Sequence, residues 1–286
     1  MQIIVSLFNS SPETPNIWIF DDSLKYIASF AKGFKDVKGL YCDDKYIYAG
    51  HRDENNDCWC LIFSKQNFEL FKKYRLTGTR RIHSIRVEDN SLFAVSSGTN
   101  QLIIYPFNIN ISENELIPKK IIFTPLTDIN SEDIIHLNSL SRDNSGSLCI
   151  SGFGKKDDGK RWAEADNGFI FNLDKGEFTA KGIYHPHSLC FQDNNYWICE
   201  SKKKTVLKNN EVVISNAIGF TRGLYVYQLE KFLFVGTSTS RVYENVIVDE
   251  NTSGVHMYSH NGKKYVVEKS FFFDDKYAEV YDVIRL

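Results

Sequence analysis

The feature of this 286-residue sequence that most constrains its fold is a pattern that recurs six times. Each unit has a polar residue, a small residue, an aliphatic strand-like segment, an Asp/Asn-type turn and a second strand-like segment. The polar residues that open the units are Lys38, His83, Asn138, His187, Arg222 and Asp282, at intervals of 35 to 60 residues. Intervals of this size fit four-stranded propeller blades with loop insertions. The repeat therefore predicts an all-β, six-bladed β-propeller.

The sixth unit reaches the C-terminus without outer strands of its own. Three strand-like segments, 1–9, 16–21 and 24–30, precede the first unit. We expect a single domain over residues 1–286, whose last blade combines one C-terminal with three N-terminal strands. Such closure leaves no exposed sheet edge. A pair of β-sandwiches is the alternative, but it would not predict six matched units.

Composition adds three expectations. Aromatic residues make up 14% of the chain, which favours strands, and the net charge of −2 argues against nucleic acid or an acidic membrane as partner. No signal-peptide pattern opens the sequence, and no apolar stretch approaches the ~18 residues of a membrane span. We interpret the six cysteines as reduced and the protein as cytoplasmic. We also expect Cys58 and Cys60 to face opposite sides of their strand.

The six opening residues carry the functional hypothesis. Inner strands of a propeller run beside the central axis, so equivalent positions converge at one end of the channel. Imidazole, amide and carboxylate groups suit a divalent ion (zinc, iron, manganese or calcium), and we assign the metal to His83, Asn138, His187 and Asp282. Lys38 and Arg222 would then bind an anionic substrate. Alternatively, the six side chains only hydrate the channel mouth and hydrogen-bond one another.

Residues that follow the second strands are expected near the same rim. We assign proton transfer to Glu200 and His51. The alternative for Glu200 is an ion pair with Lys202. The polar segment 155–167, which carries Trp162, is predicted to be an inserted loop able to cap the channel.

Serines follow three of the ring residues, at Ser84, Ser139 and Ser188. A serine beside a histidine suggests a nucleophile. Two other units have Gly39 and Gly223 at the same position, however, and we therefore favour small size at a tight strand entry.

Four segments resemble a bacterial propeller family, domain of unknown function 4915. They are EDIIHLNSL (132–140), PHS (186–188), GFTRGL (219–224) and EVYDV (279–283), and the similarity runs from about Ser131 to the C-terminus. Trp162 and Arg241 lie where that family carries Trp and a Ser-x-Arg segment, and we assign both to substrate binding. The design is more distantly similar to gluconolactonase-like and amidating-lyase-like propellers, which hold a metal in the channel. Lys38 stands where a lactonase would carry an acid in the first blade, a departure that argues against lactonase activity.

These observations predict a metal-assisted hydrolase or lyase that acts on a small anionic or sugar-like molecule. The alternative is a non-catalytic propeller that binds a ligand or a protein partner. A protein partner would require an exposed apolar patch, for which segments 108–118 and 155–167 are the places to look.

Overall fold

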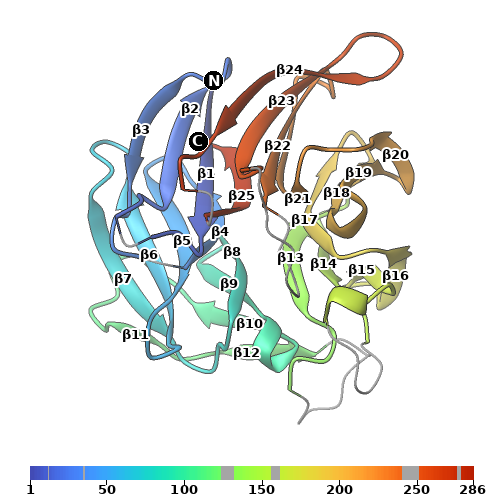
Figure 1. Ribbon diagram of the computed structural model, residues 1–286. Helices are drawn as coiled ribbons and strands as arrows, with labels where there is room; N and C mark the ends of the chain where they lie inside the picture. Colours follow the sequence, from blue (N-terminus) through green and yellow to red (C-terminus); the bar gives the residue numbers. More distant parts are fainter. Residues whose placement is uncertain (12, 35, 124–131, 156–161, 240–250, 276–277) are drawn as a thin grey trace.

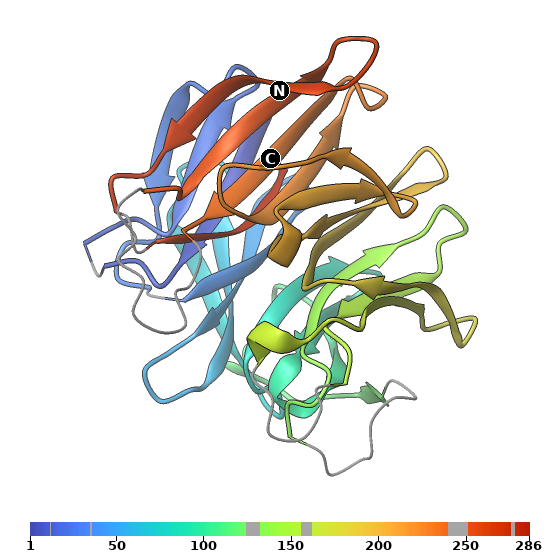
Figure 2. The ribbon, with the colours of Figure 1, turned by 45° about the vertical axis from the view of Figure 1, so that its right-hand side comes forward.

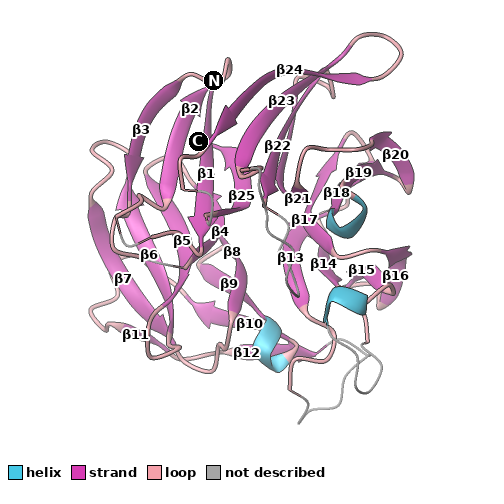
Figure 3. Cartoon of the chain, viewed as in Figure 1, coloured by secondary structure: helices cyan, strands magenta, loops and turns pink. Residues whose placement is uncertain are grey.

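Six sheets, antiparallel apart from one short parallel pair, surround a central channel, which confirms the six-bladed β-propeller (Figure 1). The computed structural model describes residues 1–286 except 12, 35, 124–131, 156–161, 240–250 and 276–277. We name the blades A to F in the order of their inner strands around the ring, with blade A at the closure. Strands account for almost all regular structure (Figure 3).

The strands of each blade are given from the channel outward. Blade A holds β25 (Glu279–Arg285), β1 (Gln2–Phe8), β2 (Ile17–Asp21) and β3 (Tyr26–Phe30). Blade B holds β4 (Val37–Cys42), β5 (Tyr46–Arg52), β6 (Cys58–Ser64), β7 (Leu70–Leu76) and β11 (Glu115–Leu116). Blade C holds β8 (Ile82–Glu88), β9 (Ser91–Ser96), β10 (Gln101–Pro106) and β12 (Lys120–Phe123).

The remaining three blades are regular. Blade D holds β13 (Leu137–Arg142), β14 (Leu148–Gly152), β15 (Gly168–Asn172) and β16 (Glu177–Ile183). Blade E holds β17 (Pro186–Gln192), β18 (Asn195–Glu200), β19 (Thr205–Lys208) and β20 (Glu211–Ile214). Blade F holds β21 (Phe220–Tyr227), β22 (Phe232–Ser238), β23 (Gly254–His260) and β24 (Tyr265–Phe272).

Among the described residues, three short 3-10 helices interrupt the loops: η1 (Ser97–Thr99), η2 (Trp162–Glu164) and η3 (Ser201–Lys203). In the part of the chain that the structure describes, no helix has the length and apolar character needed to cross a membrane.

The two ends of the chain close the ring, as the repeat predicted. Strand β25 pairs antiparallel with β1, with Ile3 opposite Arg285 and Ser6 opposite Asp282. Figures 1 and 2 show the two termini close together in both views. Blade A is therefore held together by hydrogen bonds between segments almost the whole chain apart.

Short turns and one insertion complete the blades. The pairs Asp89–Asn90 and Asn209–Asn210 have positive φ at both residues, as two-residue hairpin turns require. In segment 107–118, β11 pairs parallel with β7, and the Tyr74 hydroxyl donates to the Ile109 carbonyl at 3.0 Å. This segment covers the outer edge of blade B, which would otherwise present unpaired backbone groups.

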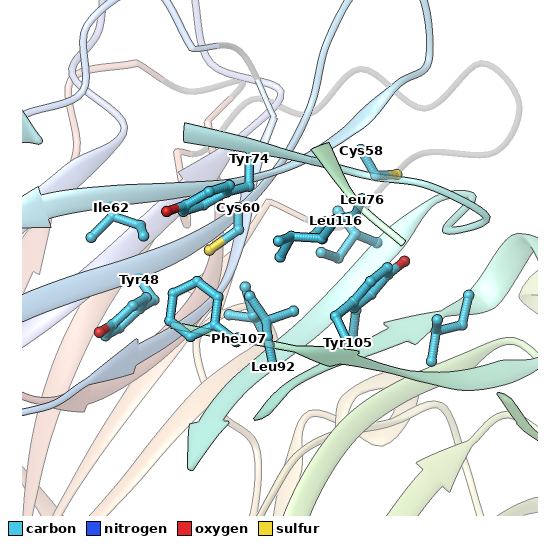
Figure 4. Packing of buried hydrophobic residues seen from close by; sticks show 14 residues of the cluster. Tyr48, Cys58, Cys60, Ile62, Tyr74, Leu76, Leu92, Tyr105, Phe107 and Leu116 are labelled. Carbon is cyan, nitrogen blue, oxygen red and sulfur yellow. The ribbon is translucent and has the colours of Figure 1, made fainter. Parts of the chain in front are cut away.

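Six apolar clusters form the core, one at each interface between neighbouring blades. Figure 4 shows the cluster between blades B and C, in which Tyr74 and Tyr105 are fully buried. Cys58 and Cys60 both belong to this cluster, so the expectation that they face opposite sides is wrong. Residues two apart in a strand share a face. All six cysteines are free thiols.

Candidate functional site

Every inner strand carries an irregularity at the same point, and this builds the site. The pairing register shifts between Val37 and Leu40 in β4, and between Ile82 and Ser84 in β8. Corresponding shifts occur in β13, β17 and β21. In blade A, Ser6 pairs with Asp282 and Leu7 with Val280, which leaves Tyr281 as the extra residue. A bulge interrupts the ladder and redirects the side chains beside it, here toward the channel.

The first ring of the channel consists of the polar residues at these bulges. Its members are Lys38, His83, Asn138, His187, Arg222 and Tyr281, which are between 2% and 8% exposed. The sixth member is therefore Tyr281 and not Asp282, a correction to the sequence prediction. The Tyr281 hydroxyl lies 2.5 Å from Nδ1 of His83, and its ring lies 5.8 Å from Nζ of Lys38.

Hydrogen bonds fix the protonation of His83. Asn138 Nδ2 donates to the His136 carbonyl at 3.2 Å, so Asn138 Oδ1 is left to accept from His83 Nδ1 at 2.8 Å. With Asn138 Oδ1 as its acceptor, His83 carries its proton on Nδ1, the Tyr281 oxygen is a second acceptor for the same N–H, and Nε2 carries a lone pair. Burial, reinforced by the Lys38 ammonium, holds the pKa of His83 well below its usual range, so the imidazole is neutral at pH 7.

His187 is held in the same tautomer. Its Nδ1 donates to the His185 carbonyl at 3.0 Å and lies 2.7 Å from Ser201 Oγ, whose own proton goes to the Thr221 carbonyl. Nε2 of His187 is buried and has no hydrogen-bond partner in the described structure. Burial, followed by the Arg222 charge, lowers the pKa of His187 well below its usual range.

The second ring contains the small residues and Asp282. Its members are Gly39, Ser84, Ser139, Ser188, Gly223 and Asp282. Ser188 Oγ accepts the backbone N–H of Gly223 at 2.9 Å, and Asp282 Oδ2 accepts that of Leu40 at 3.0 Å. A Cβ on Gly39 would lie 2.5 Å from the Cα of Ser84. At Gly39, small size is thus required by the close approach of the neighbouring inner strand β8.

A third ring follows three residues after the first. Its members are Tyr41, Arg86, Ser141, Cys190, Tyr225 and Ile284, all half-buried. The aliphatic residues between the second and third rings, such as Leu40 and Ile85, point instead into the interblade clusters.

A cavity of about 290 Å³ extends through these three rings. His83, Asn138, His187 and Tyr281 line its deep end, whereas exposed Arg285 lines its open end. The cavity therefore opens toward the C-terminal ends of the inner strands. Burial raises the pKa of Asp282, which lines the cavity, to about 6.

Aromatic and histidine side chains pack on the other side of the first ring. Phe153 is buried, stacks on His185 at 4.4 Å and contacts His187 at 5.3 Å. The rings of His83 and His136 are 4.8 Å apart, and Trp162 lies 5.0 Å from His136. Trp162 thus reaches the ring indirectly and does not line the cavity.

Lys38 and Arg222 also lie at this level, without lining the cavity. Arg222 pairs with Glu279 at 3.3 Å and lies 5.0 Å from the Phe8 ring, which Lys38 faces at 5.4 Å. Their predicted role in substrate binding stays a prediction.

The residues assigned to proton transfer lie elsewhere. Glu200 is buried and accepts from Tyr184 N, Lys203 Nζ and Thr205 Oγ1 at 2.9–3.1 Å. His51 Nδ1 contacts the Asp36 carbonyl at 3.3 Å. Neither lines the cavity. Arg241 lies outside the described residues.

The four predicted metal ligands do not form one ligand set. Asp282 is on the second ring, where backbone N–H groups hold both its oxygens, and the Asn138 oxygen is taken by His83. Nowhere in the described ranges are three or more His, Cys, Asp or Glu side chains close enough to hold a metal ion. Metal binding stays a prediction.

The third ring and Arg285 were missed at the sequence level. The charged side chains that line the cavity are Arg86, Arg285 and Asp282. Continuing each unit three residues past its opening residue would have found Tyr41, Arg86 and Tyr225, because the strand alternates with a constant register beyond the bulge.

Solved structures show the same fold in distant proteins. A putative 6-phosphogluconolactonase from Bacteroides fragilis is 13% identical, with a TM-score of 0.57 over 95% of this chain and 82% of that chain. A second, from Bacteroides uniformis, is 10% identical, with a TM-score of 0.59 over 94% and 82%. A chain of a nidogen/laminin complex is 12% identical, with a TM-score of 0.63 over 99% and 97%. Identities this low show the fold alone.

A search of curated proteins finds no match. The family model of domain of unknown function 4915, by contrast, matches residues 4–286. The match extends the similarity from the C-terminal half, where the four segments lie, to nearly the whole propeller. The chain belongs to the family of domain of unknown function 4915.

Proposed function

We propose that the protein binds a small polyhydroxylated, sugar-like molecule in its central channel. The observation that supports this most directly is the lining of the cavity, where hydroxyl, amide, imidazole and carboxyl groups from all three rings surround about 290 Å³. Ligand pockets span roughly 300–1,000 Å³, so this one is at the small end and suits a molecule of monosaccharide size.

Several lining hydroxyls are available to a ligand. Ser84, Tyr41 and Tyr225 line the cavity, and their hydroxyls have no hydrogen-bond partner among the described residues. Ser188 accepts from Gly223 N, which leaves its own proton to donate. A sugar hydroxyl both donates and accepts, so it can pair with such groups as well as with the Nε2 lone pairs of the neutral histidines.

The test is calorimetry with D-glucitol and D-gluconate, comparing wild type with Ser84→Ala. Alanine removes the hydroxyl and adds no bulk between the inner strands, so we expect affinity to fall about tenfold, the cost of one unmade hydrogen bond. Ser29→Ala, on the outer strand β3, is the matched control and should bind as wild type. Absence of binding to both compounds, or an unaffected Ser84→Ala variant, would contradict the proposal.

A metal-assisted hydrolase or lyase is the second candidate, favoured by the two histidines. His83 and His187 each donate the proton on Nδ1 to an oxygen. Nε2 of His187 is buried without a partner in the described structure, and Nε2 of His83 makes no hydrogen bond with a described residue. Metal-ligating histidines are oriented in this way. Such a metal would polarise a carbonyl or activate a water.

Elemental analysis tests this candidate. Stoichiometric metal in wild type, lost in the double variant His83→Ala/His187→Ala and kept in His260→Ala, would support it. Equal metal content in wild type and the double variant would rule it out.

A further inference from the structure

We propose that Arg86 and Arg285 form an oxyanion-recognition site at the open end of the channel, so that the preferred ligand is a sugar carrying a carboxylate or phosphate. This inference rests on the proposed function and specifies its ligand. The two arginines belong to different inner strands, β8 and β25, and both line the cavity.

Arg86 is held in place at Nε, and its two terminal nitrogens remain available to a ligand. Its Nε bonds Glu88 Oε2 at 2.5 Å, and neither Nη1 nor Nη2 has a partner among the described residues. The guanidinium lies 5.6 Å from the Tyr41 ring, which limits its rotation. A planar guanidinium held at Nε presents the paired N–H groups that grip an oxyanion in bidentate fashion.

Glu88 does not neutralise this end of the channel. The same carboxylate also accepts from Arg142 Nε at 2.6 Å, so one negative charge serves two guanidiniums. Burial opposes ionisation of Glu88, but the hydrogen bonds from Arg142 and Arg86 outweigh it and lower its pKa. The group therefore keeps a net positive charge at pH 7.

Arg285 adds a second cation on the same side. It is exposed and makes no ion pair with any described residue. Blades A, B and C are neighbours, so Arg285, Tyr41 and Arg86 follow one another along one arc of the channel mouth. On the other side of β25, Arg285 is near enough to Tyr225 to offset part of the rise in its pKa that burial causes.

The opposite polarity of the deep end orients the ligand. Asp282 is the charged side chain of the inner lining, and its carboxylate would repel an oxyanion placed there. The serines, Asn138 and the two neutral imidazoles at that depth suit hydroxyl groups. The cavity is therefore built to take the oxyanion at the mouth and the polyol inside.

The experiment compares three ligands that share a six-carbon polyol: D-glucitol, D-gluconate and D-glucitol 6-phosphate. We expect wild type to bind at least one of the two anions about tenfold or more tightly than glucitol, because each charge-assisted hydrogen bond is stronger than a neutral one. Whichever anion binds more tightly identifies the class as sugar acid or sugar phosphate. The preference should shrink as salt rises.

Substitutions of the two arginines test whether they cause the preference for an anion over glucitol. Arg285→Gln and Arg86→Gln should each weaken the binding of the anion about tenfold and leave glucitol affinity unchanged. Arg75→Gln, which removes an equally charged side chain on the outer strand β7, should leave all three affinities unchanged. Because Arg285 is exposed and makes no contact needed for folding among the described residues, that variant keeps the test decisive if Arg86→Gln unfolds.

The outcomes separate the two proposals. Equal affinity for the three compounds, or an anion preference that survives both substitutions, overturns this inference and leaves the proposed function standing. Absence of binding to all three contradicts the proposed function and this inference with it.

Discussion

The carboxylate of Asp282 accepts the backbone N–H of Leu40 at 3.0 Å, across the interface between blades A and B. Ser139 does the same for Leu189 at 3.0 Å, and Ser188 for Gly223 at 2.9 Å. At these three bulges a backbone donor has no partner in its own blade, and a buried donor without a partner is costly. In each case an oxygen from the preceding blade is the acceptor. In blade A, which is built from both ends of the chain, Asp282 takes the role that a serine has in blades D and E.

The Asp282 link should make stability depend on pH in an unusual direction. Burial raises the pKa of Asp282 from an ordinary 3.8 to about 6, so between these values the folded protein keeps a proton that the unfolded chain releases. Its contribution is therefore full below about pH 4 and declines as pH rises to 6. The free energy of unfolding of wild type, minus that of Asp282→Asn, should fall by up to about 3 kcal/mol over this window and be flat above pH 7. Urea unfolding at four pH values measures it.

Asp143→Asn is the control for that measurement. The N–H groups of Ser145 and Ser147, with the Ser145 hydroxyl, outweigh the effect of burial and lower the pKa of Asp143. The free energy of unfolding of wild type, minus that of Asp143→Asn, should therefore rise with pH through the acid range. A wild-type minus Asp282→Asn difference that also rises would show that Asp282 is not held as described.

The serine links should be measurable individually. Ser188→Ala removes the acceptor of Gly223 N and leaves a donor between two inner strands, at a cost of about 1–3 kcal/mol of unfolding free energy. Ser84→Ala changes the equivalent position in blade C, where the hydroxyl has no partner among the described residues, and should cost less than about 0.5 kcal/mol. Equal losses in the two variants would refute a specific role for the Ser188 bond.

Five of the six members of the first ring were predictable, because each blade repeats the same bulge and places a polar residue there. The sixth was not, since Asp282 is the acid of the last unit and looks like a ring member, whereas Tyr281 does not. Only the pairing of β25 with β1 shows which of the two is left out of the ladder. A carboxylate fits the small-residue position because it can replace a serine as acceptor for the next blade.

The open end of the channel could not be predicted in the same way. Which end is filled depends on Phe153, His136 and His185. The two histidines each stand two residues before a first-ring residue, but their packing on Phe153 and on the first ring joins different blades, and the repeat does not show such contacts. Glu200 illustrates the same limit. Its place after a second strand suggested a rim carboxylate near Lys202, but the chain turns into η3 and the partner is Lys203.

Acid should destabilise the protein through His256 in blade F. This side chain is 0% exposed, with Nε2 against Thr237 Oγ1 and Nδ1 against Ser270 Oγ, both at 2.8 Å. Burial lowers its pKa to about 4, so its contribution is present above about pH 6.5 and is lost as pH falls to 4. The free energy of unfolding of wild type, minus that of His256→Gln, should therefore decrease by up to about 3 kcal/mol as pH falls from about 6.5 to 4.

Ser270→Ala separates titration from packing at the same place. It removes one hydrogen bond of His256 but no ionisable group, so its destabilisation should be constant within about 0.5 kcal/mol between pH 7 and 4. If the difference in free energy of unfolding between wild type and His256→Gln does not change with pH, the imidazole is not buried as described.

Substitution of Glu200 tests whether this carboxylate has a structural or a chemical role. Its carboxylate accepts hydrogen bonds from three groups and lies away from the cavity. It accepts from Tyr184 N, Lys203 Nζ and Thr205 Oγ1, and it does not line the channel. Glu200→Gln weakens the bond from Lys203 and should lower the free energy of unfolding by about 1–3 kcal/mol.

The affinity of Glu200→Gln for a ligand, measured by calorimetry with whichever of the three polyols binds most tightly, should change less than twofold. Asn138→Ala, at the deep end of the cavity, should instead lower affinity about tenfold. A Glu200→Gln variant that folds as stably as wild type but loses ligand binding would return this carboxylate to the functional site.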